Sequence, residues 1–280
     1  MKGRIEERIF LGLMYLSVAL VSISLVLILG VILFKGAGSL SLDMITKVPE
    51  GGYYFGKGGG VLNAIAGSLV ISVAATILAF CLSLPIALFI HTYLREGSRR
   101  AVILRFCFDL LSGIPSIVYG AFGFTLMIIL HLRASALAGI ITVALLIMPI
   151  MMRGMDEVLR MVPRELRETS LALGATGFET GLRVLLRKCA GGFLTAVLIA
   201  FGRGIGDAPS VLFTAGYTDS LPTGLLEPAA TLPLAIFFQI GTPFPAVRGR
   251  AYASAFVLTL IILAISIITR RLVSREKGQT

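Results

Sequence analysis

Six long apolar runs constrain the fold of this chain more than any other feature of its sequence. An α-helix needs about 20 apolar residues to cross the hydrocarbon core of a bilayer, and these runs reach or approach that length. Because a chain in lipid must satisfy its backbone hydrogen bonds internally, the runs predict an all-α integral membrane protein with six transmembrane helices. The runs cover residues 9–34, 61–90, 108–130, 135–152, 191–215 and 251–269.

The composition excludes an ordinary soluble domain. Hydrophobic residues make up 56% of the 280 residues, charged residues only 14%, and the mean hydropathy is +0.94. The net charge of +10 would indicate nucleic-acid binding if the basic residues gathered on one solvated face, but they lie between the apolar runs. We therefore expect a single transmembrane domain over residues 1–280, with membrane lipid around it and no nucleic acid as a partner.

The distribution of lysines and arginines predicts which side of the membrane each loop occupies. Eighteen of the 25 lie in four segments: the N-terminal tail, residues 93–106, residues 153–190 and the C-terminal tail. The loops on the opposite side hold six, and Arg203 lies within the fifth run. Because cytoplasmic loops carry the excess of positive charge, both termini and residues 153–190 are expected in the cytoplasm.

The cytoplasmic segment 153–190 is polar but has helical periodicity. Pro163 can open a short helix, Gly174 can end it, and a second short helix with an apolar stripe follows from about 178 to 188. Two short amphipathic helices, hinged at a glycine and held between two spans, are typical of a docking element. We therefore predict that residues 153–190 couple the membrane domain to a cytoplasmic partner.

The outer segment 217–250 contains an apolar piece, residues 231–240, with prolines on both sides. A piece of about ten residues is too short to cross the bilayer, and prolines disfavour a free helix. We interpret the segment as a lid or interfacial element packed against the outer mouth. An ordinary structured loop is the alternative.

The sequence at 163–178, Pro-Arg-Glu-Leu-Arg-Glu-Thr-Ser-Leu-Ala-Leu-Gly-Ala-Thr-Gly-Phe, resembles the EAA loop of the permeases of ATP-driven (ABC) importers. That pattern is a glutamate, two small residues, and a glycine six positions after the glutamate. Glu168, Thr169, Ser170 and Gly174 match it, with Thr and Ser in place of the two alanines. The later Leu-Pro of the pattern is Leu186-Arg187 here, which is a departure.

The resemblance to this permease family implies a type I importer fold and a role for those four matching residues in coupling to an ATPase. It also implies that the chain is not an enzyme, because a partner subunit hydrolyses ATP, and that it needs no cofactor. The residues agree with this implication, since no nucleophile with an adjacent base, paired acid and base carboxylates, or metal-ligand cluster is evident.

Within that family, four strings resemble the permeases of phosphate importers. The implied partners are a second permease subunit, an ATPase dimer and an extracytoplasmic phosphate-binding protein, all at the inner (plasma) membrane. Asp207 stands where those permeases usually have Glu. Two alternatives remain: a permease for another oxyanion such as molybdate or tungstate, and a self-sufficient secondary transporter, although no internal repeat is evident. The strings are Ser41-Leu-Asp-Met-Ile, Gly59-Gly-Val-Leu-Asn-Ala-Ile-Ala-Gly-Ser, Gly113-Ile-Pro-Ser-Ile-Val-Tyr-Gly and Arg203-Gly-Ile-Gly-Asp-Ala-Pro-Ser-Val-Leu-Phe-Thr-Ala.

Arg203 and Asp207 are the main candidates for the substrate path. They are four residues apart in the fifth run, so they share one helix face, and charged residues inside a membrane usually face a transport path or a partner charge. The planar fork of an arginine suits a tetrahedral oxyanion. The alternative is that the two residues only neutralise each other at a subunit interface. Because their charges sum to zero, further positive charge would have to come from a partner subunit.

Ser116 and Tyr119 are weaker candidates for the path. Both follow Pro115 within the third run, where the proline is expected to kink the helix, as Pro85 is in the second run. A hydroxyl at a kink can line a polar path. We therefore include both residues in the predicted path.

Overall fold

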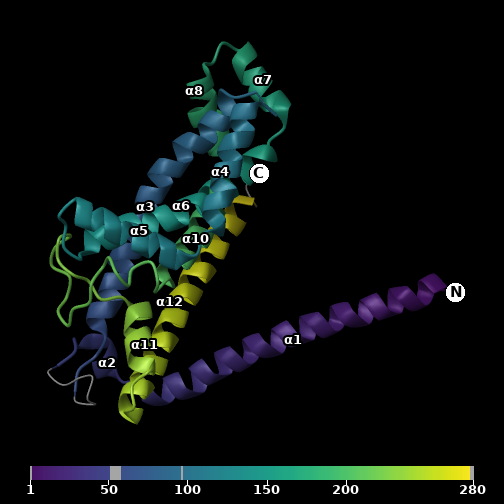
Figure 1. Ribbon diagram of the computed structural model, residues 1–280. Helices are drawn as coiled ribbons and strands as arrows, with labels where there is room; N and C mark the ends of the chain where they lie inside the picture. The colour runs from purple at the N-terminus through teal and green to yellow at the C-terminus, as the bar shows by residue number, and fades with distance from the viewer. Residues whose placement is uncertain (1, 51–57, 96, 278–280) are drawn as a thin grey trace.

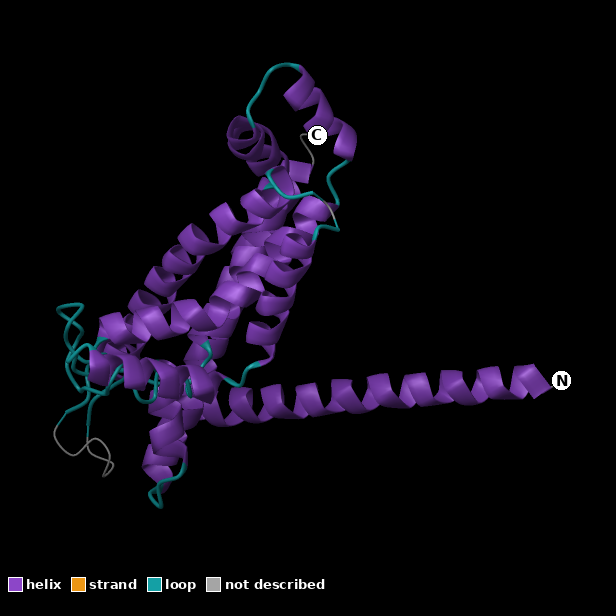
Figure 2. Ribbon diagram, turned by 45° about the horizontal axis from the view of Figure 1, so that its top comes forward, coloured by secondary structure: helices purple, strands orange, loops and turns teal. Residues whose placement is uncertain are grey.

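The computed structural model describes residues 2–50, 58–95 and 97–277, which form helices joined by turns and loops (Figure 1 and Figure 2). Within those ranges the only β-structure is an isolated antiparallel bridge between Pro49 and Gly59. The first half holds α1 (Lys2–Ser39), α2 (Leu42–Thr46), α3 (Leu62–Thr92), α4 (Arg99–Gly113), α5 (Ser116–Ile129) and α6 (Ala136–Arg160). The second half holds α7 (Arg164–Ala172), α8 (Gly177–Glu179), the π-helical segment η2 (Thr180–Leu185), α9 (Leu186–Lys188), α10 (Ala190–Ile205), α11 (Leu232–Ile240) and α12 (Pro245–Lys277).

The all-α membrane prediction is confirmed. Four helices are long and apolar enough to cross a membrane: Glu6–Ser39, Leu62–Thr92, Ala136–Arg160 and Pro245–Ile268. Two bent pairs pass the same test together, α4 with α5 at 98° and the segment Gly177–Lys188 with α10 at 78°. The described residues therefore supply up to six spans if each bent pair is one span.

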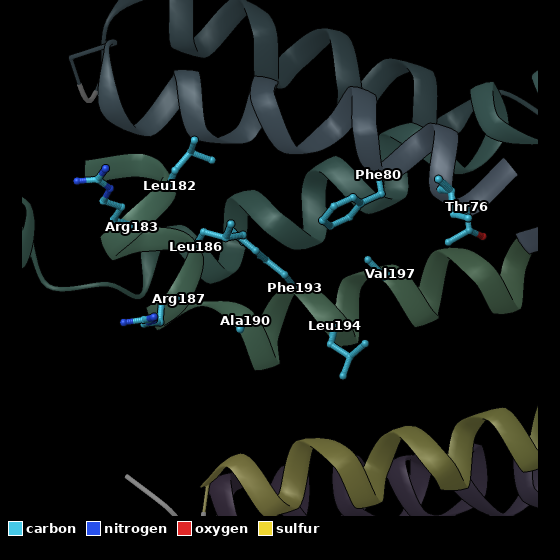
Figure 3. Close-up of a pocket in the computed structure, with 11 residues that line it drawn as sticks. Thr76, Phe80, Leu182, Arg183, Leu186, Arg187, Ala190, Phe193, Leu194 and Val197 are labelled. Carbon is cyan, nitrogen blue, oxygen red and sulfur yellow. The ribbon is translucent and has the colours of Figure 1, made fainter. Parts of the chain in front are cut away.

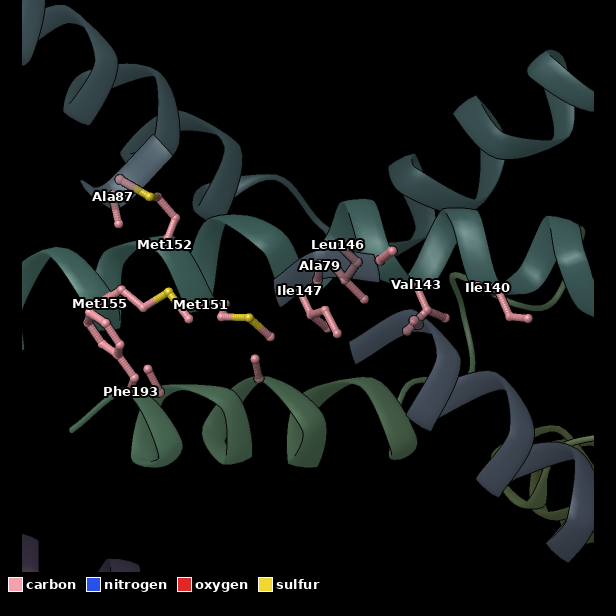
Figure 4. Packing of buried hydrophobic residues seen from close by; sticks show 14 of the residues in the cluster. Ala79, Ala87, Ile140, Val143, Leu146, Ile147, Met151, Met152, Met155 and Phe193 are labelled. Carbon is pink, nitrogen blue, oxygen red and sulfur yellow. The ribbon is translucent and has the colours of Figure 1, made fainter. Parts of the chain in front are cut away.

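Helix α6 is the centre of the packed core. It lies against α3, α4, α5 and α10, and most of its side chains are buried. Figure 4 shows Met151 and Met155 on the side of α6 that faces α10, where Phe193 lies. Gly154 lets α10 approach, because a Cβ there would lie 2.8 Å from the Cβ of Ala196. Since lipid provides no hydrophobic drive between helices, such close packing is what holds this pair together.

The predicted third span, 108–130, is broken in the structure at Pro115. Helix α4 ends at Gly113 and α5 begins at Ser116, because a proline ring disfavours the helical conformation at the residue before it. Ile114 is accordingly extended, with φ −71° and ψ 130°. Pro85, for which a kink was also predicted, lies inside the continuous helix α3.

The fourth and fifth predicted spans have different ends from those expected. Helix α6 continues to Arg160, past the predicted end at 152, so residues 153–160 of the predicted coupling segment belong to the helix of the fourth span. Helix α10 ends at Ile205, so only part of the predicted span 191–215 is helical. The backbone N–H of Ser210 donates to Asp207 Oδ2 at 2.9 Å, a local bond that competes with helix continuation.

The segment 217–250 contains helix α11, which packs on α12 and α3. The backbone N–H of Leu232 donates to Ser68 Oγ at 2.8 Å, and Gly67 leaves room for the backbone of Ala230. The apolar piece of this segment is therefore a short helix held against two spans.

Helix α1 projects away from the other helices and meets α12 only near its C-terminal end (Figure 1). There Gly36 is close to the carbonyl of Tyr252, 2.7 Å from where a Cβ would lie, and Lys35 Nζ is 5.0 Å from the centroid of the Tyr252 ring. N-terminal to this contact, none of the most apolar stretch of α1 is buried against the rest of the described chain. Its apolar surface therefore requires lipid or another subunit as a cover.

Candidate functional site

Arg203 and Asp207 form an ion pair at the C-terminal end of α10. Arg203 Nη1 lies 3.0 Å from Asp207 Oδ1, so the structure brings the two residues together. Their exposure differs sharply, at 47% for the arginine side chain and 1% for the aspartate. With Oδ2 accepting from the N–H of Ser210, both carboxylate oxygens have a partner. The buried carboxylate is held in place, while the arginine keeps an exposed side with further N–H donors.

The turn that follows Asp207 packs closely against α5. Gly120 lies beside the carbonyl of Pro209, 2.6 Å from where a Cβ would be, and Gly123 meets Thr142 and Thr214. Any larger residue at Gly120 would push this backbone away. The hydroxyl of Ser210 is buried and has no hydrogen-bond partner among the described residues. The turn that holds Asp207 therefore contains a buried hydroxyl, that of Ser210, without a partner among the described residues.

Ser116 and Tyr119 occupy a different place from the ion pair. Ser116 is half-buried at the first turn of α5. Tyr119 is buried, and its hydroxyl donates to the carbonyl of Leu111 at 2.8 Å, across the break between α4 and α5. Between residues 97 and 277, no hydrogen bond or ion pair joins either residue to Arg203 or Asp207. The Tyr119 hydroxyl thus fixes the bend at Pro115.

Helix α7 carries the four predicted coupling residues and ends at a glycine cap. Gly174 has φ +86°, a left-handed conformation that a glycine adopts without strain. Its N–H donates to the carbonyl of Leu171, and the N–H of Ala175 donates to that of Ser170, at 3.0 and 3.2 Å. This pair of bonds is the Schellman motif, which stops a helix and turns the chain. Glu168 and Thr169 are exposed on α7, and Ser170 is buried.

Side-chain contacts anchor α7 to the neighbouring elements. Ser170 Oγ and Thr180 Oγ1 lie 2.9 Å apart and join α7 to η2. Arg167 Nη2 donates to the carbonyl of Thr92 at 2.8 Å, at the end of α3. Displacement of α7 would therefore pull directly on the end of a long membrane helix.

The second short helix begins with a capping box. Thr176 Oγ1 accepts from the N–H of Glu179, and the Glu179 carboxylate accepts from the N–H of Thr176 at 3.0 Å. This backbone bond holds the pKa of Glu179 below its ordinary value. The residues from Gly177 to Lys188 thus begin a separate helical segment after the cap at Gly174.

An ion cluster that the sequence did not predict lies close to α7. Asp156 of α6 is nearly buried, and it is bound by His91 of α3, Arg105 of α4 and Arg160 of α6 itself. The N–O distances are 2.8, 3.0 and 2.9 Å. The spacing of Arg160 from Asp156 was visible in the sequence, but the other two partners come from distant helices. The cluster fixes three helices next to α7.

A large apolar cavity of about 940 Å³ lies between α3, the α9 segment and α10. Figure 3 shows Phe80, Leu186 and Phe193 along it, with Arg183 and Arg187 at one end. Its lining offers few polar groups to a small anion. Apart from these two arginines, the cavity is thus better suited to an apolar group than to a small anion.

Comparison with known proteins identifies relatives along almost the whole chain. A family model described as "Binding-protein-dependent transport system inner membrane component" matches residues 83–278. A "Phosphate transport system permease protein PstA" of Haemophilus influenzae is 35% identical over 97% of this chain and 95% of its own length. Proteins of the same name from Xylella fastidiosa and Mycobacterium leprae are each 32% identical, over 87% and 95% of this chain and 84% and 88% of their own lengths.

The fold is also similar to a solved structure. A chain of the inward-facing MetNI methionine ABC transporter superposes with a TM-score of 0.64 at 19% sequence identity. The match covers 77% of this chain and 95% of that chain. This likeness concerns the fold alone.

Proposed function

Because the chain belongs to the family of binding-protein-dependent transport system inner membrane components, we propose that it is a permease subunit of an ATP-driven importer of inorganic phosphate. It is a multi-pass protein of the inner membrane, in a family whose ATPase is a separate subunit. The choice of phosphate as the substrate rests on the 35% identity, over 97% of this chain, to a phosphate-system permease.

The proposed partners are a second permease subunit, two ATPase subunits and a phosphate-binding protein outside the membrane. The ATPase would bind α7 at the exposed residues Glu168 and Thr169. Since Arg167 binds the end of α3 and Ser170 binds η2, ATPase closure would move α7 and the membrane helices together. The orientation that this requires, with α7 in the cytoplasm, is supported by the positive charge bias.

The proposed contact with the translocating anion is Arg203. Asp207 occupies one edge of the guanidinium, and the exposed remainder can donate charge-assisted hydrogen bonds to phosphate oxygens. The pair carries no net charge, so attraction of a dianion needs positive groups from the second permease. We place the path at the interface between the two permeases for this reason. Ser116 stays a candidate for the wall of the path, as does Tyr119 through its ring.

Purification of the native complex from a membrane tests this function. We expect the chain to co-purify with a second permease and an ATPase, and the associated binding protein to carry phosphate, as measured by mass spectrometry and ligand assay. If the binding protein carries molybdate or tungstate instead, the proposed substrate, phosphate, is wrong. Recovery of a chain that transports alone would show a self-sufficient transporter and overturn the proposal.

A further inference from the structure

The apolar cavity of about 940 Å³ is separate from the proposed anion path, since neither Arg203 nor Asp207 lines it. It lies in the bend where the segment Gly177–Lys188 meets α10 at 78°, with α3 as the third wall. Leu186 lines it from that segment and Phe193 from α10 (Figure 3). A ligand in this bend would therefore contact the end of the predicted coupling segment and two membrane helices at once.

The polar groups of the cavity are few and unevenly placed. Among the described residues that line it, the polar side chains are Thr76, Arg183 and Arg187. The Thr76 hydroxyl donates to the carbonyl of Ser72 in its own helix at 2.7 Å, so its proton is already used. Both arginines lie at one end (Figure 3). The cavity is thus apolar along its walls and basic at one end.

Arg187 gives this end a positive charge that no carboxylate balances. Its side chain is exposed and, among the described residues, has no hydrogen bond or ion pair. Arg183 differs, because its Nη1 lies 3.3 Å from Glu179 Oε1 and that pair sums to zero charge. Lys188, which is exposed but does not line the cavity, follows Arg187 directly. A ligand that suits both parts of the site has an apolar tail and an anionic head.

The depth and size of the cavity fit a lipid chain. The lining stretch of α10 from Ala190 to Val197 rises about 10 Å, within the roughly 15 Å of hydrocarbon in one leaflet. Three turns of a partner helix would occupy about 1,300 Å³, more than the 940 Å³ available. Ile77 and Leu182 are exposed members of the lining, so the cavity is open to an entering chain.

The predicted orientation matches the same ligand. The charge bias places residues 153–190 on the cytoplasmic side, where the membrane surface carries negative potential from anionic lipids. Basic pockets between membrane helices on that side suit anionic headgroups.

We propose that this cavity binds an anionic phospholipid of the cytoplasmic leaflet, with an acyl chain between α3 and α10 and the headgroup phosphate at Arg187. The lipid would join the segment Gly177–Lys188 to both helices and stabilise the angle between them. The proposal rests on the walls and charge of this cavity, and it holds whichever substrate the permease carries.

Photocrosslinking tests where the acyl chain lies. The purified native complex is held in nanodiscs of phosphatidylcholine that contain phosphatidylglycerol with a diazirine in its acyl chain. We expect mass spectrometry to find crosslinks on peptides that contain residues 76–80 and 182–197. Ala190→Trp places a large side chain at the exposed edge of the cavity and should remove most of these crosslinks. Ile199→Trp, exposed on the same helix outside the lining, is the matched control and should keep them.

Lipid titration followed by native mass spectrometry tests the headgroup contact. Arg187→Gln should weaken phosphatidylglycerol binding about fivefold, which corresponds to about 1 kcal/mol for one basic residue at an anionic surface. Phosphatidylcholine binding should not change. Lys188→Gln removes the same charge from the neighbouring residue outside the lining and should bind phosphatidylglycerol nearly as tightly as the unchanged complex. Arg187→Lys keeps the charge and should restore most of the affinity.

The two variants at the cavity test the proposal independently, because Arg187 is exposed and its replacement fills no space. Equal crosslinking in the Ala190→Trp and Ile199→Trp complexes would overturn the site. Equal affinity of the unchanged complex for phosphatidylglycerol and phosphatidylcholine would also overturn it. So would loss of the second permease from the Ala190→Trp complex alone, because the cavity would then be a contact between subunits. None of these results depends on phosphate uptake.

Discussion

Arg203 and Asp207 differ in what surrounds them, and this difference bears on their role. Asp207 is buried and held by two partners, whereas nearly half of the Arg203 side chain is exposed. A pair that served only for neutralisation would gain nothing from an exposed arginine. The i, i+4 spacing predicted the pair itself, because such residues are neighbours on a helix. The bond from Ser210 could not be predicted, since it depends on the end of α10 at Ile205.

A double-mutant cycle separates the two roles of Arg203. Arg203→Gln should reduce phosphate uptake at least tenfold, because a charge-assisted hydrogen bond is worth about 1.5–3 kcal/mol. The assembled complex should remain. In the double variant with Asp207→Asn, stability should recover from any loss caused by the unpaired carboxylate, while uptake stays low. Recovery of uptake in the double variant would show that the arginine only neutralises Asp207.

Asp156 offers a second test at the scale of single residues. Asp156→Asn removes the carboxylate that holds His91, Arg105 and Arg160, and should lower the free energy of unfolding by roughly 2–4 kcal/mol. Asp109→Asn is the matched control, because Asp109 is exposed and, among the described residues, forms an ion pair only with Arg153, at 2.8 Å, so a change of at most about 1 kcal/mol is expected. Circular dichroism of the detergent-solubilised chain measures both. Equal losses of unfolding free energy in the two variants would mean that the Asp156 cluster does not stabilise the packing of α3, α4 and α6.

The partners of Asp156 from other helices in this cluster could not be predicted from the sequence. His91 and Arg105 are 65 and 51 residues from Asp156 along the chain. A single sequence contains no signal that joins residues at such separations. The charge of each residue could be predicted to lie near a membrane surface, but its partner depends on how α3, α4 and α6 pack.

At the scale of elements, apolar length predicted the existence of helices better than their ends. Proline acted differently at two positions: Pro115 divides α4 from α5, whereas Pro85 lies within continuous α3. Neighbouring helices decide whether the freed backbone groups find partners, and a single sequence does not contain that information. The docking segment was more predictable, because Pro163 and Gly174 act through local backbone conformation.

The cap of α7 gives an element-scale prediction. Gly174→Pro should abolish transport and weaken association with the ATPase, because proline cannot adopt φ +86° and lacks the N–H that binds Leu171. Gly174→Asn is the control, since asparagine tolerates the left-handed conformation, and should retain most activity. Co-purification and uptake measure the two effects. A fully active complex with proline at 174 would remove the coupling role of this turn.

The charge on α7 gives a separate prediction. Glu168→Lys should abolish transport while the chain stays inserted, because Glu168 is exposed on the proposed ATPase contact. Glu165→Lys, at the first turn of the same helix, is the comparison for a general loss of helix stability. Uptake and ATPase co-purification should fall more at 168 than at 165. The reverse order would place the ATPase contact elsewhere.

At the scale of the whole molecule, the arrangement is incomplete without other components. Helix α1 leaves the core and exposes its apolar side chains along its span. The positive charge needed to attract a phosphate dianion is also absent from the Arg203 and Asp207 pair. Both features agree with a subunit of a larger complex, which the EAA-like string indicates and the family match supports.

The orientation of the chain can be tested by thiol labelling in intact cells, after Cys81, Cys107 and Cys189 are replaced. Single cysteines at Ser98 and Glu179 should be shielded from an impermeant reagent, whereas one at Asp219 should label. The charge bias places the first two on the cytoplasmic side and the third outside. Labelling at Glu179 without permeabilisation would contradict this orientation and the place of α7.

Uptake by the reconstituted complex tests the central claim, ATP-driven phosphate import through this subunit, most directly. Proteoliposomes would hold the permeases and ATPase, with ATP on the ATPase side and the phosphate-loaded binding protein on the other. We predict accumulation of radiolabelled phosphate that requires ATP, persists in excess tungstate and is lost with Gly174→Pro. Phosphate accumulation without ATP, or ATP-driven transport of tungstate in preference to phosphate, would contradict the claim.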